Sequence, residues 1–137
     1  MNEIVVGVNE SETARRAAEA AATLAAETGS GLHVVMCVDR GARNLRVGGE
    51  TWHIDSVAEA EQFVASLAIG SSPPSVSHTI SFDDPADALC RIADDLDARM
   101  IVVGNRRLQG ASRILGSVAL DVLRKASCDV HVAYTTD

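Results

Sequence analysis

The chain has 137 residues and a formal net charge of −7, which suits about one globular domain and argues against general nucleic-acid binding, because phosphate backbones require a basic surface. Its three cysteines, Cys37, Cys90 and Cys128, are odd in number and form no Cys-x-x-Cys pair. We therefore expect neither a disulfide framework nor a cysteine metal site. The cysteine pattern fits a reducing cytoplasm. An acidic residue near the N-terminus and the lack of an apolar run of roughly 18 residues predict neither an export signal nor a membrane-spanning helix.

Five short apolar stretches, rich in β-branched residues, predict strands. They cover residues 3–8, 31–38, 75–81, 98–104 and 129–134. Stretches with helical spacing or helix-capping residues lie between them, and they cover residues 11–28, 54–68, 84–96 and 115–126. This alternation predicts a single doubly wound α/β domain over residues 1–137, with a mostly parallel five-stranded sheet and helices on both faces.

The loop after the fourth predicted strand is the first candidate for a ligand site, because such sheets bind ligands at the carboxyl ends of their strands. It contains Gly104, Gly110 and Gly116, spaced six residues apart. Gly116 and Ser117 stand at the expected start of the last helix, where free amides and the helix dipole favour an anion. From spacing alone, phosphate binding and a tight turn with a serine cap are equally good interpretations. The stretch is neither a P-loop nor a dinucleotide fingerprint.

Basic residues cluster in two segments, one after the second predicted strand and one after the fourth. The clusters are Arg40, Arg43 and Arg46, and Arg106, Arg107 and Arg113. A solvated loop is the ordinary explanation for Arg43 and Arg46. In an acidic chain, however, two basic segments at one edge would create a local positive potential that suits an anionic ligand.

Three stretches of the sequence resemble the universal stress protein family, and together they extend the resemblance over the full chain. They are VVGVNESETARRAAEAA near the N-terminus, LHVVMCV in the second strand and, most specifically, IVVGNRRLQGASRILGSVALDVLRKASCDVHVAYT at the C-terminal end. The resemblance implies the strand order 3-2-1-4-5. It also implies a stress-response sensor or adaptor that binds ATP, or a smaller adenine nucleotide such as AMP or cyclic AMP, with Mg²⁺ as a candidate companion ion.

The family pattern points to particular residues of the phosphate loop. In nucleotide-binding members this loop reads Gly-x-x-Gly, a spacer, and then Gly-Ser or Gly-Thr, and its amides wrap the triphosphate. This chain keeps Gly104, Gly116 and Ser117, followed by Val118, but it has Arg107 at the second glycine and a spacer one residue shorter. A side chain at position 107 hinders close approach of the backbone to a phosphate.

Four further residues complete the candidate nucleotide site. The guanidinium groups of Arg106 and Arg107 offer the phosphates a different set of donors. Asn9 stands where many family members have an Asp that helps to hold the nucleotide, and Val38 matches a position whose backbone meets adenine. Each also has a structural interpretation, Asn9 as a cap of the first helix and Val38 as a core residue at a strand end.

The last predicted strand suggests how the protein associates. An exposed apolar edge strand invites pairing with another chain, and universal stress proteins typically dimerise through this strand. The resemblance therefore implies a homodimer with Val130, Val132 and Tyr134 near the interface, together with an unidentified protein partner.

Two interpretations of the function remain open. One is a nucleotide-binding stress sensor that is not an enzyme, with at most slow ATP hydrolysis, because no general base or metal-binding carboxylate can be assigned beside the loop. The other is a dimeric interaction module without nucleotide binding, which Asn9, Arg107 and the shortened spacer favour. A receiver domain and a flavodoxin-like carrier are set aside, because their acidic pair, lysine and hydroxyl-rich phosphate loop are missing. We assign no catalytic or metal-binding residue and expect the histidines to be structural.

Overall fold

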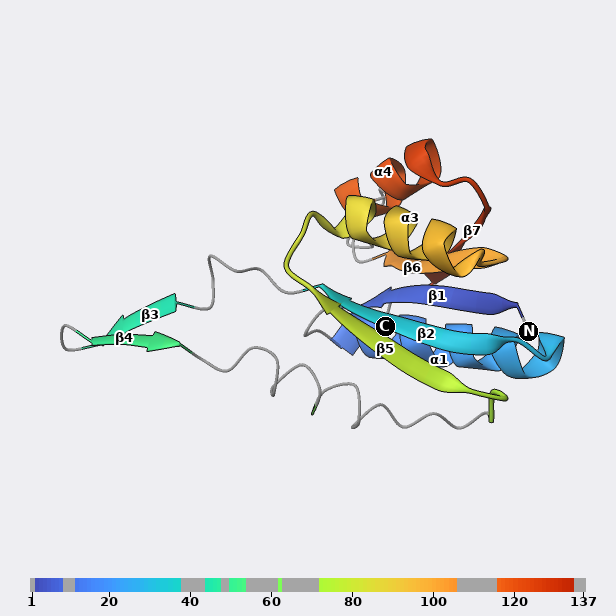
Figure 1. The fold of residues 1–137 in the computed structure, drawn as a ribbon, viewed down its shortest axis with the longest axis horizontal. Coiled ribbons are helices and arrows are strands. Elements are labelled where there is room, and N and C mark those ends of the chain that lie inside the picture. The colour runs from blue at the N-terminus through green and yellow to red at the C-terminus, as the bar shows by residue number, and fades with distance from the viewer. Residues whose placement is uncertain are drawn as a thin grey trace.

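The computed structural model describes residues 2–8, 12–37, 44–47, 50–53, 62, 72–105 and 116–134. Five parallel strands form the main sheet in the order β5-β2-β1-β6-β7 (Figure 1). The strands are β1 (Glu3–Val8), β2 (Gly31–Cys37), β5 (Val76–Ser81), β6 (Met100–Asn105) and β7 (Asp129–Tyr134). They are the five strands predicted from the sequence, so this order is the expected 3-2-1-4-5 and confirms the doubly wound α/β fold.

Helices cover both faces of the sheet. The helix α1 (Glu12–Thr28) lies on one face, and α3 (Pro85–Leu96) and α4 (Ser117–Lys125) lie on the other (Figure 1). Five buried alanines of α1 pack against the sheet: Ala17, Ala18, Ala21, Ala22 and Ala25. Small side chains let the helix approach the strands closely, which explains why this alanine-rich segment forms part of the core.

The start of α3 follows directly from the sequence. The carboxylate of Asp84 accepts a hydrogen bond from the backbone N–H of Asp87 at 3.1 Å, and Pro85 occupies the first turn, as predicted. Leu89 and Ile92 of α3 are buried together with Val122 of α4 above the sheet. An exposed ion pair at 2.7 Å between Lys125 Nζ and Asp87 Oδ1 also joins the two helices.

The segment after β2 departs from the sequence analysis. The strands β3 (Asn44–Val47) and β4 (Glu50–His53) form an antiparallel hairpin of their own, separate from the main sheet (Figure 1). The expected loop at Arg46 is therefore wrong, because Arg46 lies within β3. The overlooked signal is the Gly48-Gly49 pair between two short stretches, which is typical of a two-residue hairpin connection.

Other predictions for this segment cannot be compared with the structure. Arg40 and Arg43 lie outside the described residues, and so does the predicted helix over 54–68 apart from Gln62, which is helical. In the part of the chain that the structure describes, no helix has both the length and the apolar character needed to cross a membrane.

Candidate functional site

The candidate site lies at the carboxyl edge of the sheet, between β1 and β6. These strands are neighbours, and Val6 pairs with Val102. From β1 the chain crosses to β2 on one side, whereas β6 and β7 lie on the other side. The order therefore reverses between β1 and β6, which is where open α/β sheets bind ligands.

The N-terminus of α4 places backbone N–H groups without an intrahelical acceptor at this edge. Gly116 is the N-cap residue, with extended backbone angles of φ −65° and ψ 163°, and within the described structure no side chain caps the helix. The Gly116 carbonyl accepts the N–H of Leu120 at 3.1 Å, whereas the first-turn amides lack an intrahelical acceptor. A Cβ added on Gly116 would meet no heavy atom of the described residues within 4 Å, so the cap position itself is uncrowded.

Ser117 has a different position from the one expected for a capping residue. It is the first residue of α4, and its side chain is exposed beside the free amides. The interpretation of Ser117 as the helix cap is thus wrong, because Gly116 occupies the cap position. The exposed Ser117 thus places a hydroxyl and an amide at the helix start, the kind of position at which helices bind anions.

The predicted site residues divide into two groups. The first group lies at one edge of the sheet, because α4 returns the chain from the carboxyl end of β6 to the amino end of β7. It consists of Gly104, near the end of β6, and of Gly116, Ser117 and Val118, at the start of α4. Val118 is 37% exposed, so it is not required by the core. The second group lies outside the described residues: Asn9, Val38, Arg106 and Arg107.

The neighbouring helix start at this edge has the opposite character. At the N-terminus of α3, Asp84 already supplies a negative charge and accepts the amide of Asp87. Burial raises the pKa of the nearby Cys37 thiol to about 11, and the charge of Asp84 adds to the effect, so this thiol is neutral at pH 7. An anion would therefore prefer the start of α4, where no carboxylate stands in the first turn.

The structure also joins residues that the sequence analysis did not connect. His33 of β2 contacts the hydroxyls of Ser77 and Thr79 of β5 through its two ring nitrogens. These residues are more than 40 positions apart in the chain, so sequence spacing gave no signal of their contact. Among the described residues, no group of three or more His, Cys, Asp or Glu side chains could hold a metal ion.

The fold and this edge define a doubly wound α/β protein with a helix N-terminus at the carboxyl edge of its sheet. The model of the Universal stress protein family matches residues 1–133, so the chain belongs to this family, as the sequence analysis predicted.

Two universal stress proteins, each from a strain of Mycobacterium tuberculosis, are 47% identical to the chain over 53 residues, or 38% of this chain and 36% of theirs. The chain thus aligns with little more than a third of the length of these relatives.

Similar solved structures cover nearly the whole chain. A universal stress protein from Archaeoglobus fulgidus has 27% identity and a TM-score of 0.69, over 96% of this chain and 98% of that one. A structure of the Archaeoglobus fulgidus protein described as a complex with dAMP has 28% identity and a TM-score of 0.66, over 96% and 97% of the two chains. Another universal stress protein, described as a complex with cAMP, has 28% identity and a TM-score of 0.67 over 98% of both chains.

Proposed function

We propose that this stress protein binds an adenine nucleotide at the carboxyl edge between β1 and β6, with the phosphate at the N-terminus of α4. The observation that carries the proposal is the start of α4 at the carboxyl edge of the sheet, where Gly116 is the N-cap residue and, among the described residues, no side chain caps the helix. Two relatives of the same fold are described as complexes with cAMP and dAMP. The protein would act as a sensor or adaptor whose state depends on the bound nucleotide.

A nucleotide with one phosphate suits this chain better than ATP. The spacer between position 107 and Gly116 is one residue shorter than the family pattern, and Arg107 replaces a glycine that would wrap further phosphates. In the proposed complex, the amides of Ser117 and Val118 hold the phosphate, while Arg106 and Arg107 neutralise its charge. Gly104 allows close approach of the backbone.

Two other residues contact the adenosine part of the ligand in this proposal. Asn9 hydrogen-bonds the sugar, and the backbone of Val38 meets the adenine ring. If ATP binds instead, Mg²⁺ enters with its phosphates.

Isothermal titration with ATP, ADP, AMP and cyclic AMP, each with and without Mg²⁺, tests the proposal. The protein is first shown to be free of carried-over nucleotide by its absorbance spectrum. We expect micromolar binding, with AMP or cyclic AMP bound more tightly than ATP. If none of the four binds, the nucleotide proposal is wrong, and the dimeric interaction module becomes the better interpretation.

We also propose that the protein is a cytoplasmic homodimer that pairs through β7. Two observations support the pairing: β7 is an edge strand of the sheet, and α4, which packs on β6 and β7, exposes Leu120 and Leu123. Apolar side chains beside an open edge favour association with another chain. Val130, Val132 and Tyr134 would then lie at the interface.

A further inference from the structure

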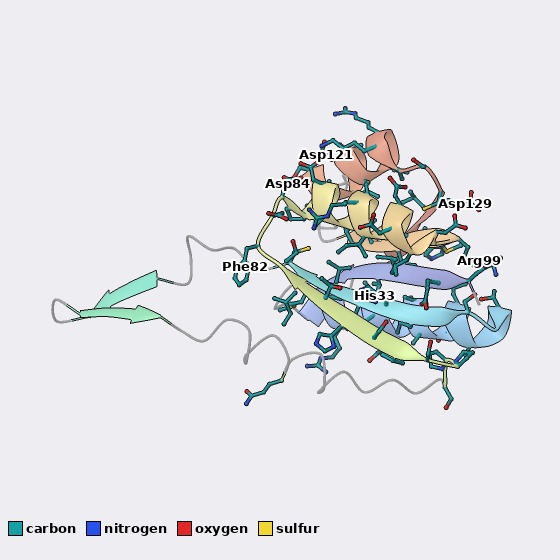
Figure 2. The ribbon with its side chains drawn as sticks, in the orientation of Figure 1. His33, Phe82, Asp84, Arg99, Asp121 and Asp129 are labelled. Atoms are coloured by element: carbon teal, nitrogen blue, oxygen red, sulfur yellow. The ribbon has the colours of Figure 1, made fainter. Side chains whose placement is uncertain are left out.

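His33 lies on the face of the sheet that carries α3 and α4, beside the edge strand β5 (Figure 2). Side chains alternate along a strand, and Val35 packs with α3 and α4 whereas Leu32 and Val34 pack with α1. His33 therefore shares the face of Val35. In the register of the two strands, Ser77 is directly opposite His33, and Thr79 is the next residue of β5 on the same face.

The imidazole of His33 bridges the two hydroxyls. Its Nδ1 lies 2.6 Å from Ser77 Oγ, and its Nε2 lies 2.7 Å from Thr79 Oγ1. His33 is only 8% exposed, whereas Ser77 is exposed to solvent. A buried ring held at both nitrogens has a fixed orientation, and its contact with Ser77 joins it to an exposed residue of the edge strand.

The imidazole of His33 is neutral at pH 7, so it can act as a base. Burial lowers the pKa of His33, Glu3 on β1 partly opposes this effect, and His78 on β5 adds to it. The neutral imidazole carries a single proton, so one nitrogen donates and the other accepts. With the proton on Nε2, the ring donates to Thr79 and accepts the O–H of Ser77 at Nδ1.

We propose that Ser77 is an activated nucleophile, that His33 is its general base, and that the pair accepts acyl groups from small activated esters. A nucleophile within hydrogen-bond reach of a base, with a third group orienting the base, is the arrangement that covalent catalysis requires. Thr79 is the orienting group in this assignment. Ser77 is preferred as the nucleophile because it is an exposed residue with a primary hydroxyl, whereas Thr79 is half-buried and its hydroxyl is secondary.

The reaction has two steps, acylation of Ser77 and hydrolysis of the acyl-serine. Ser77 Oγ attacks the ester carbonyl carbon while its proton passes to His33 Nδ1. The bond to the leaving alcohol then breaks, and that alcohol departs with the proton from His33. Water, deprotonated by His33, attacks the acyl carbon of the acyl-serine. The bond from this carbon to Ser77 Oγ then breaks, His33 returns the proton to Ser77 Oγ, and the carboxylic acid is released. This activity is separate from the proposed nucleotide site and does not depend on it.

Two probes test the nucleophile in the full-length protein. A fluorophosphonate is attacked at phosphorus and loses fluoride, with the serine proton passing to His33, and peptide mass spectrometry locates the adduct. With p-nitrophenyl acetate, the release of p-nitrophenol reports acylation. We expect the adduct on Ser77 and none at this position in Ser77→Ala. The matched controls are Ser127→Ala and His78→Gln, which change exposed residues. Neither substitution should reduce the labelling rate that the protein reaches at high pH.

His33→Gln separates a base from a merely structural residue. Glutamine still hydrogen-bonds to hydroxyls, so the fold is retained, which circular dichroism verifies, but it cannot take the proton. We expect the labelling rate to fall about 10²-fold, the low end of what a general base contributes. In the unsubstituted protein, the rate should rise with pH as His33 loses its proton, with a midpoint below the ordinary histidine pKa of 6.5, and then level off.

Three outcomes would overturn the assignment. The first is labelling of Ser77 no faster than that of Ser127. The second is a labelling rate that His33→Gln leaves unchanged, which would make His33 a structural residue only. The third is an adduct on Thr79, which would mean that the ring accepts at Nε2 and that Ser77 is not the nucleophile.

Discussion

A Cβ atom placed on Gly7 of β1 would lie only 2.7 Å from Cδ1 of Leu89 of α3. Leu89 is 1% exposed and packs in the core under α3, so its side chain has little room to turn away. The lack of a side chain at Gly7 therefore allows α3 to approach β1 closely. This strand leads to the candidate site.

Gly7→Ala should destabilise the protein by overpacking this contact. We expect a loss of about 1–3 kcal/mol in the free energy of unfolding, measured by urea denaturation followed by circular dichroism. Gly116→Ala is the matched control, because an added Cβ there meets nothing within 4 Å, and we expect it to cost less than about 1 kcal/mol. Equal losses from the two substitutions would show that the contact with Leu89 is not limiting.

Ser117→Pro tests the role of the α4 amides in nucleotide binding. Proline suits the first position of a helix, and the extended backbone of Gly116, with φ −65° and ψ 163°, accepts a following proline. The substitution removes one amide donor and the hydroxyl while the helix remains. We expect about tenfold weaker binding of AMP or cyclic AMP, as for the loss of a hydrogen bond to a charged group, measured by isothermal titration.

Ser117→Ala is the companion variant to this proline substitution. It removes the hydroxyl and keeps the amide, so it should weaken nucleotide binding less than the proline does. An affinity that neither change alters would place the phosphate away from the start of α4. A loss of helical signal in Ser117→Pro would instead indicate damage to the fold, so the circular dichroism spectrum is compared first.

Much of the fold could be predicted because strong local signals coincide with tertiary structure. The buried strands read as nearly continuous apolar runs, and Asp84 with Pro85 marks the start of α3. The β3–β4 hairpin was missed because four-residue strands carry too little periodicity to override a loop interpretation. The pairing of His33 with Ser77 depends on the register of β2 and β5, which sequence spacing alone does not contain.

For the candidate site, the sequence predicted the start of α4 but not which residue is its cap. Gly116 was identified as a helix start because a glycine-serine pair after a strand is a local signal. That Gly116 rather than Ser117 is the cap could not be predicted, because the boundary depends on backbone angles that either residue can adopt.

Cys37 should react unusually slowly with alkylating reagents in the folded protein. Burial and Asp84 raise the pKa of its thiol from the ordinary 9.0 to about 11, and the thiolate is the reactive form. At about pH 8 the thiolate is then roughly 10²-fold scarcer than for an ordinary cysteine. Iodoacetamide labelling with peptide mass spectrometry measures the rate. Labelling in urea is the control, because unfolding should abolish the protection. Rapid labelling of Cys37 without urea would contradict the burial.

Leu123→Lys should weaken the proposed homodimer without unfolding the protomer. Leu123 is 45% exposed on α4, so a lysine there costs little core packing but places a charge at the proposed interface. Light scattering coupled to size-exclusion chromatography measures the mass. We expect a dimer for the unsubstituted chain and a larger monomer fraction for the variant at low micromolar concentration. Thr23→Lys, at an exposed position on α1, is the control and should leave the dimer intact.

The pH dependence of stability should carry a contribution from His33. Burial holds its pKa in the folded state below the unfolded value of 6.5, so the folded protein favours the neutral ring. The stability from this residue is therefore full above about pH 6.5 and is lost as the pH falls through the lower folded-state pKa. We compare the urea midpoints of the unsubstituted chain and of His33→Gln at about pH 7.5 and at about pH 5. Titration of the carboxylates affects both proteins equally, so the difference between them reports the contribution of His33. We expect a shallower decline in His33→Gln. Parallel declines would mean that His33 is charged or neutral to the same extent in both states.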